Sequence, residues 1–335
     1  MNKWNKLNKD ICPDVLLDND GKKVGTYLKG VPIDSVANIR KYLDKPHEII
    51  ITTAFVNEIK SQLHEMNIYE NITDYIEKDK EISWQYLIKN KELHRKKTSS
   101  RCFIIGTGPS LSELDLRCVM NEDKIMVNHI DKDVELVKLN PNFWVVADPV
   151  FWLHEQEFLD PVLETLKCNL PSTQLLIPDN VLSYTSKDLL SETNIYFYTL
   201  NRTANYETVT IDFSEAVPRF AQNVISVALM LAIYLKYEEI VLIGCDHSWW
   251  GYSEAEIEQG IVVPHYYKEN ESDVEFVTNS FKSLGHQRLQ ETIEIQKKEY
   301  AALRSIAEEN RLRVYNATPG GYLESFPRIR FQDLF

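Results

Sequence analysis

The segment Gly106-Thr107-Gly108-Pro109-Ser110-Leu111 carries the residue types whose spacing best suits ligand binding. It follows the apolar run Cys102–Ile105, which predicts a buried strand. The two glycines allow the backbone to approach a ligand closely, and the proline fixes the turn. Ser110 or Ser112 can cap a short following helix, whose first N–H groups suit a phosphate or a ribose hydroxyl. The segment is neither a P-loop nor the dinucleotide fingerprint, because no Gly-Lys-Ser/Thr follows and a leucine takes the third glycine position.

Small, polar or titratable residues follow several other predicted strands. The second strand is followed by Asn128-His129, the third by Asp148-Pro149, the sixth by Gly244-Cys245-Asp246-His247, and the last by Asn316. Such residues also end strands simply because they turn well. In an open α/β sheet, however, ligands bind outside the carboxyl ends of the strands. Their recurrence at this one edge therefore predicts a site there.

A series of short apolar runs must position these residues. The predicted strands are Cys102–Ile105, Lys124–Val127, Phe143–Ala147, Gln174–Ile177, Ile195–Tyr198, Glu239–Ile243 and Leu312–Tyr315. They alternate with helical patterns, and Asn223–Lys236 is apolar almost all round, as expected of a helix buried on the sheet. The pattern predicts an α/β domain with a doubly wound, mainly parallel sheet.

The first ninety residues have a different pattern. We expect a small α/β extension over 1–90, a polar and basic linker over 91–101, and the main domain over 102–335. Within the extension, 32–43 and 72–90 are expected to be helical, 48–53 a strand, and the stretch from Val56 a further helix.

The composition excludes several classes of protein. The chain has 335 residues and a formal net charge of −13, which argues against binding nucleic acid or an anionic membrane through a broad basic face. No apolar stretch is long enough for a membrane span, and no secretory signal is expected. Five scattered cysteines fit a reducing cytoplasm, so we expect a cytoplasmic location, with peripheral attachment to the inner face of the membrane left open.

The strand-end motifs resemble those of bacterial sialyltransferases with a single Rossmann-like domain. They also resemble the related motility-associated-factor and MptE-like family, which includes glycosyltransferases and archaeal 6-hydroxymethylpterin diphosphokinases. The resemblance covers most of 101–328, but not 1–90. It rests on the Gly-Thr-Gly-Pro-Ser-Leu loop, Asn128, the buried helix leading to Asp246, Asp246-His247-Ser248-Trp249, His265-Tyr266-Tyr267, Gly285-His286 and 316–321. It implies a Rossmann-like fold.

The resemblance also implies a reaction. The enzyme would move a sialic-acid-like (nonulosonic) sugar from a CMP-activated donor to a hydroxyl of a glycan or protein, for instance in the synthesis of a surface glycan. Transfer would invert the anomeric centre and need no metal or other cofactor, because the CMP-sugar is a substrate. The partners would be the donor and the acceptor, without nucleic acid, and a homo-oligomer is left open.

Site residues follow from the resemblance position by position. The nucleotide would be held by Gly106, Thr107, Gly108, Pro109, Ser110, Asn128, Asp148, Gln222 and Asn223. The donor or its phosphate would contact Asp246, Ser248, Trp249, Tyr252, Tyr266 and Tyr267. Two positions depart from the sialyltransferase pattern, because Asp148 replaces an asparagine and His247 begins a segment that lacks the usual tyrosine. Asp246 is expected mainly to fix loop geometry, and the aromatic pairs have an equally good role in closing the edge of the core.

A histidine is expected to act as the general base. His286 is the first choice, because it lies at the start of a predicted helix whose N-terminus keeps an imidazole neutral. His247 and His265 are rivals, and either could instead bind the donor's carboxylate or phosphate. Arg219, Arg288 and Arg328 are further, less favoured partners for the sugar carboxylate.

Two other functions remain open. One is a pterin diphosphokinase-like enzyme that uses ATP and Mg²⁺, with Asp148 and Asp246 as its carboxylate pair. The other is a non-catalytic protein that binds a nucleotide sugar or glycan in the same cleft.

Overall fold

The structure is a computed structural model. It describes residues 13–28, 30–43, 47, 49–51, 56–69, 72–74, 86–148, 151, 155–183, 192–201, 210–218, 223–260, 265–269, 274–275, 278–279, 282 and 285–335. The chain divides into two compact units, Met1–Ile82 and Ser83–Phe335.

The smaller unit contains two short sheets, a helix and a small core. One sheet has the order β1-β3-β2, formed by Leu16–Asp18, Val31–Ser35 and Tyr27–Leu28. The other pairs β4 (Ile49–Ile51) with β5 (Ile72–Asp74) in parallel. The 3₁₀ helix η1 (Val36–Tyr42) and helix α2 (Val56–Glu65) complete it. The buried core residues are Ile39, Ile51, Leu63 and Ile68.

Two expectations for this unit are corrected. The helix expected over 72–90 is wrong at its start, because the β-branched Ile72 and Thr73 pair with β4 instead. The helix expected over 32–43 begins only after Ser35, whose hydroxyl accepts a hydrogen bond from the N–H of Ala37. The strand expected over 48–53 is confirmed over Ile49–Ile51, and its other residues lie outside the described ones. The helix from Val56 is confirmed.

The basic segment 91–101 contains the end of a helix that belongs to the larger unit and packs on its core. Helix η2 (Ile88–Lys96) is of the 3₁₀ type and buries Leu93 completely. The side-chain amide of Asn90 donates to the carbonyls of Phe197 and Phe213, both at 2.7 Å. The boundary between the units therefore lies at 82–83 rather than in the predicted linker. One leucine among polar residues gave no periodic signal from which this packing could be predicted.

The larger unit is built on an eight-stranded sheet of order β11-β10-β9-β8-β7-β6-β12-β13. Every neighbouring pair of strands is parallel. The strands are β6 (Arg101–Ile105), β7 (Asp123–Val127), β8 (Phe143–Val145), β9 (Gln174–Pro178), β10 (Ile195–Asn201), β11 (Ala216–Pro218), β12 (Glu239–Ile243) and β13 (Arg313–Asn316). The predicted doubly wound, Rossmann-like α/β fold is confirmed. The edge strand β11 was not predicted, because it is short and ends in a proline.

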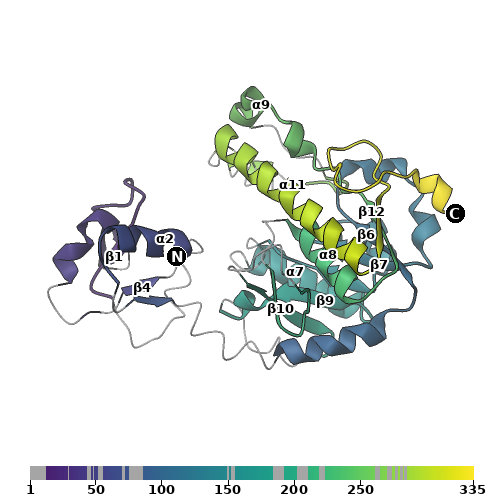
Figure 1. Cartoon of the computed structure of the whole chain (residues 1–335), viewed down its shortest axis with the longest axis horizontal. Coiled ribbons are helices and arrows are strands. Elements are labelled where there is room, and N and C mark those ends of the chain that lie inside the picture. Colours follow the sequence, from purple (N-terminus) through teal and green to yellow (C-terminus); the bar gives the residue numbers. More distant parts are fainter. Residues whose placement is uncertain are drawn as a thin grey trace. The chain divides into compact units, whose positions relative to one another are not determined.

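Helices cover both faces of this sheet (Figure 1). On one face, α8 (Val224–Tyr234) packs on the central strands and against α11 (His286–Glu309). The other face is covered by α5 (Val134–Lys138) and α7 (Glu155–Cys168). The remaining helices are α9 (Glu254–Gln259), η3 (Pro109–Glu113), η4 (Leu116–Val119), η5 (Ile130–Lys132), η6 (Asp179–Ser183), η8 (Ser248–Gly251) and η9 (Phe331–Leu334). None of the helices in the described ranges has the length and apolar character needed to span a membrane.

The order of the strands reverses between β6 and β12. From β6 the chain adds strands outward to β11 on one side, whereas β12 and β13 lie on the other side. The loops that leave β6 and β12 at their carboxyl ends therefore meet at the switch point, where ligands bind in folds of this type.

Candidate functional site

The two glycines after β6 allow that loop to pack directly on the loop after β12. The N–H of Gly106 donates to the carbonyl of Ile243 and that of Gly108 to the carbonyl of Gly244, both at 2.9 Å. A Cβ atom at Gly106 would clash with the Gly244 carbonyl oxygen, and one at Gly108 would clash with the Asp246 carboxylate. The sequence predicted that these glycines make room for a ligand. In the structure, the room they leave is filled by the neighbouring loop.

Asp246 joins these two loops. Its carboxylate accepts hydrogen bonds from the N–H of Ser110 at 3.2 Å and from its hydroxyl at 2.8 Å. Asp246 is 9% exposed, and this burial raises the pKa of its carboxyl group above the usual range. Both hydrogen-bond donors of Ser110 are thus bound by Asp246. These bonds hold the two loops together, which is the role expected of Asp246.

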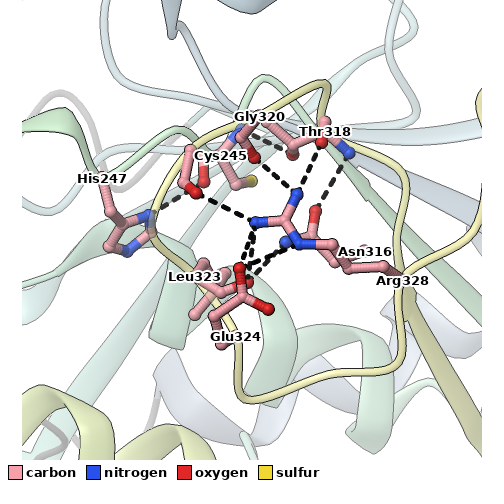
Figure 2. A network of polar contacts seen from close by, with 9 residues as sticks. Cys245, His247, Asn316, Thr318, Gly320, Leu323, Glu324 and Arg328 are labelled. Atoms are coloured by element: carbon pink, nitrogen blue, oxygen red, sulfur yellow. Dashed lines mark hydrogen bonds and ion pairs between the residues drawn. The ribbon is translucent and has the colours of Figure 1, made fainter.

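A third loop, after β13, is held by Arg328 (Figure 2). The guanidinium donates to the carbonyls of Thr318 at 2.9 Å and Gly321 at 3.1 Å, and it pairs with Glu324 at 2.9 Å. The Thr318 hydroxyl accepts from the N–H of Cys245 at 3.1 Å, so this loop is fastened to the one after β12. Arg328 therefore has protein acceptors in place of the sugar carboxylate considered for it.

His247 is enclosed beneath the same loops. Its Nδ1 lies 3.0 Å from the Cys245 carbonyl, and its Nε2 lies 2.9 Å from both the Asn223 amide and the Tyr300 hydroxyl. Because a carbonyl only accepts, Nδ1 carries the proton and Nε2 is the acceptor. Burial lowers the pKa of His247 to about 4, so the ring is neutral at pH 7. Both ring nitrogens are already used by the protein, which leaves neither for a substrate.

Asn223, a predicted nucleotide contact, is also fully used within the fold. Its side-chain oxygen accepts from the N–H of Ile225 at 2.9 Å and so caps α8. Its amide nitrogen is 2.9 Å from His247 and donates to Tyr300 at 2.8 Å. The neighbouring Gln222 lies outside the described residues.

Asn128, at the carboxyl end of β7, has a different environment. It adopts a left-handed backbone conformation with φ +48°, which asparagine tolerates better than most residues. Its main-chain carbonyl accepts from the indole N–H of Trp144 at 2.7 Å. The side-chain oxygen, however, is buried and has no hydrogen-bond partner among the residues that the structure describes. A buried polar atom of this kind is costly unless another group supplies the donor.

The segment 265–269 lies beside Asn128 and the glycine-rich loop. The N–H of Tyr266 donates to the carbonyl of Thr107 at 2.8 Å. The ring of Tyr267 stacks on His265 with centroids 4.9 Å apart and meets the edge of His129 at 6.1 Å. The structure therefore brings His265, Tyr266 and Tyr267 to the loops after β6 and β7, as the sequence predicted for a common site.

His286 lies at the first residue of α11, away from these loops. Tyr300, which contacts His247, is 14 residues further along the same helix, or about 21 Å at the rise of an α-helix. The described contact of the His286 ring is with the Gln290 side chain at 3.4 Å. His286 lines a cavity of about 920 Å³ together with Glu254 and Glu258 of α9 and Arg288 and Glu291 of α11.

The other predicted site residues are less informative. Asp148 is exposed after β8, whereas Thr107, Pro109 and Ser248 are partly buried. Trp249 and Tyr252 pack against the core, and burial raises the pKa of Tyr252. Across the described part of the chain, no three His, Cys, Asp or Glu side chains converge in a way that could hold a metal ion.

Sequence reasoning missed the partners of the histidines at this edge. Glu269 accepts a hydrogen bond from His265 at 2.8 Å, and Asp131 lies 3.7 Å from His129. Lys132 lies over the Tyr267 ring at 5.6 Å. The four-residue spacing of His265 and Glu269 was the one signal in the sequence for their contact. That spacing brings two side chains together only where the backbone turns.

Comparisons with known proteins add little to this description. No protein-family model matches the chain, and no curated protein sequence matches it. Among solved structures, the chain is similar to the sialyltransferase CST-II, crystallised with a trisaccharide acceptor and CMP. The identity is 13%, the alignment covers 68% of this chain and 85% of CST-II, and the TM-score is 0.39.

Proposed function

We propose that the chain is an inverting glycosyltransferase that takes a sialic-acid-like sugar from a CMP-activated donor and delivers it to a hydroxyl of a glycan or protein. The observation that carries the proposal is the side-chain oxygen of Asn128 at the switch-point edge, which is buried and has no partner in the described part of the chain. A nucleotide offers the missing donor, either a ribose hydroxyl or the exocyclic amine of cytosine. The resemblance of the strand-end motifs to sialyltransferases supports the choice of nucleotide.

The chemistry needs few groups from the protein. The phosphate of a CMP-sugar is already a good leaving group, so the enzyme must hold the two substrates in line and remove the proton of the acceptor hydroxyl. In this proposal, the loops after β6, β7 and β8 hold the nucleotide through Thr107, Asn128 and Asp148. A histidine at the same edge accepts the proton, and no metal takes part.

The first test is nucleotide binding. Thermal unfolding should be followed with CMP, CTP, ATP and UDP, each with and without Mg²⁺. We expect CMP alone to raise the melting temperature, because only ligands that bind the native state stabilise it. Stabilisation by ATP with Mg²⁺ and by nothing else would instead favour the diphosphokinase reading.

The second test removes the unpaired oxygen. In Asn128→Gly the backbone keeps its left-handed conformation, since glycine adopts positive φ freely. We expect CMP affinity to fall about tenfold, the loss of one hydrogen bond to a polar ligand group. Asn140→Gly is the matched control, because Asn140 also has a positive φ but is exposed near the amino end of β8. Equal CMP affinity in both variants would place the nucleotide elsewhere.

The third test is turnover. Incubation with CMP-sialic acid and a set of glycan and peptide acceptors should release CMP and form a product heavier by one sugar. Binding of CMP with no transfer to any acceptor would favour the non-catalytic reading.

A further inference from the structure

His265 and Glu269 form a hydrogen-bonded pair at the carboxyl edge of the sheet. The Nδ1 atom of His265 lies 2.8 Å from an Oε1 carboxylate oxygen of Glu269. The His265 side chain is 24% exposed and that of Glu269 11%. The ring is thus held on one side by a largely buried carboxylate, while part of it is reachable from solvent.

The main chain fixes the place of this pair. Tyr266 is hydrogen-bonded through its N–H to Thr107 of the glycine-rich loop. Tyr267 is 6% exposed and its ring is nearly parallel to that of His265, with an interplanar angle of 8°. The Tyr267 ring also contacts the ring of His129, the neighbour of Asn128. The pair therefore lies beside the loops to which we assign the nucleotide.

The hydrogen bond decides which nitrogen can react. A carboxylate only accepts, so Nδ1 of His265 carries the proton in the neutral ring. Nε2 then holds the lone pair, and the ring cannot turn without breaking the bond to Glu269. In general-base catalysis, a histidine that takes the proton of a nucleophile is often oriented by a carboxylate on its other ring nitrogen. Glu269 holds His265 in this way. His247 has the same tautomer, but its Nε2 is enclosed by Asn223 and Tyr300.

We propose that His265 is the general base of the transfer and that Glu269 is its positioning residue. This rests on the proposed glycosyltransferase function and decides among the histidines that it leaves open. Nε2 of His265 takes the proton of the acceptor hydroxyl, whose oxygen forms the new bond to the anomeric carbon. The bond from that carbon to the phosphate oxygen breaks, and its electron pair stays on the phosphate of the departing CMP. Glu269 faces the imidazolium that forms.

The first experiment compares turnover and donor binding in full-length variants. We expect His265→Gln to lower kcat at least 100-fold, the usual contribution of a general base, with CMP-induced stabilisation unchanged. His286→Gln should keep most of its turnover, and His64→Gln, an exposed position in the smaller unit, is the neutral control. Loss of turnover in His286→Gln but not in His265→Gln would overturn the assignment. Absence of CMP stabilisation in the wild type would instead count against the proposed function.

The second experiment tests Glu269 through its separate effects on kcat and KM. Glu269→Gln can still accept the Nδ1 proton but carries no charge. We expect kcat to fall about tenfold while the acceptor KM and the CMP-induced stabilisation stay unchanged, because only the imidazolium formed in the transition state loses its anionic partner. A Glu269 that only braced the segment would change stability or KM without a selective loss of kcat, and that result would contradict its role.

A spectroscopic measurement does not depend on turnover. Nitrogen-15 NMR of the histidine side chains distinguishes the two neutral tautomers. We expect the Nδ1–H form for His265, assigned by its loss in His265→Gln, and a shift towards the commoner Nε2–H form in Glu269→Ala. An Nε2–H tautomer in the wild type would overturn the proposal, because no lone pair would then face the acceptor.

Discussion

The two ends of β7 use polar side chains in opposite ways. At its start, the buried carboxylate of Asp123 accepts hydrogen bonds from Thr98, Ser99, Asn142 and Tyr237. At its end, five residues later, the buried side-chain oxygen of Asn128 accepts none from the described residues. The carboxylate at the first end therefore has its donors within the fold, whereas the amide oxygen at the second end is the atom to which we assign a ligand.

The largest effect is expected at the start of the strand. Asp123→Ala would leave the Tyr237 hydroxyl and the N–H groups of Thr98 and Ser99 without their acceptor. Each buried donor left unpaired costs about 1–3 kcal/mol, so we expect the free energy of unfolding to fall by about 4 kcal/mol. Urea unfolding at pH 7 would measure this. Asn128→Gly should lose far less, and equal losses at the two positions would remove the contrast on which the nucleotide assignment depends.

A second effect concerns the enclosed histidine and its pH dependence. The pKa of His247 is about 4 in the folded chain, below its usual value near 6.5. Between these values the unfolded state binds more protons, so stability is complete above about pH 6.5 and falls as the pH drops towards 4. The group contributes roughly 3 kcal/mol over this window.

The measurement compares the wild type with His247→Asn, because asparagine tolerates the φ of +52° at this position. The variant should be less stable at pH 7, and the difference between the two should shrink towards pH 4.5. Carboxylates common to both proteins cancel in this comparison. A difference independent of pH would mean that His247 is not held neutral, and would return it to the candidate bases.

A third, smaller effect tests why the loop after β6 contains glycine. In Gly106→Ala the new methyl group meets the carbonyl of Gly244, so one of the two loops must move. Such overpacking costs about 1–3 kcal/mol. Gly21→Ala is the control, because nothing lies within 4 Å of its Cβ position. If Gly106→Ala kept full stability but lost CMP binding, the glycine would serve the ligand, as the sequence suggested, rather than the neighbouring loop.

The sequence predicted the structure well where a hydrophobic pattern extends over several residues. It predicted less where the structure of a segment depends on a single tertiary contact. Strands such as Glu239–Ile243 and the buried helix α8 carry continuous apolar signals, so the parallel sheet and the loops at its carboxyl edge could be predicted. Leu93 is one buried residue in a basic stretch, and nothing local to it indicates that it packs on the sheet. The pairing of Ile72–Asp74 with β4 depends in the same way on a partner more than twenty residues away.

The candidate site shows the same limit. Residue types at strand ends predicted which loops meet. They did not predict which side chains hydrogen-bond to one another. Ser110 is bound by Asp246 and Asn223 by His247, pairs separated by 136 and 24 residues. Conversely, the value of His265 depends on Glu269, whose role needs the turn that brings the two together. Such pairings follow from tertiary contacts, which a single sequence does not encode locally.

The smallest effect on stability is expected in the loop after β13, which is bonded to the loop after β12. Arg328 is about one-third exposed and holds the carbonyls of Thr318 and Gly321, so Arg328→Ala should cost only about 1 kcal/mol after screening by solvent. The local effect should be larger than the global one, because the loop then loses the bonds to the carbonyls of Thr318 and Gly321 but keeps the bond from Asn316 to Leu323. Hydrogen exchange should become faster at the N–H of Tyr322, which donates to Asp246, while exchange within β7 stays unchanged. Faster exchange at Asn128 as well would show that the loop after β13 also stabilises the end of β7. The two regions would then open together as one cooperative unit.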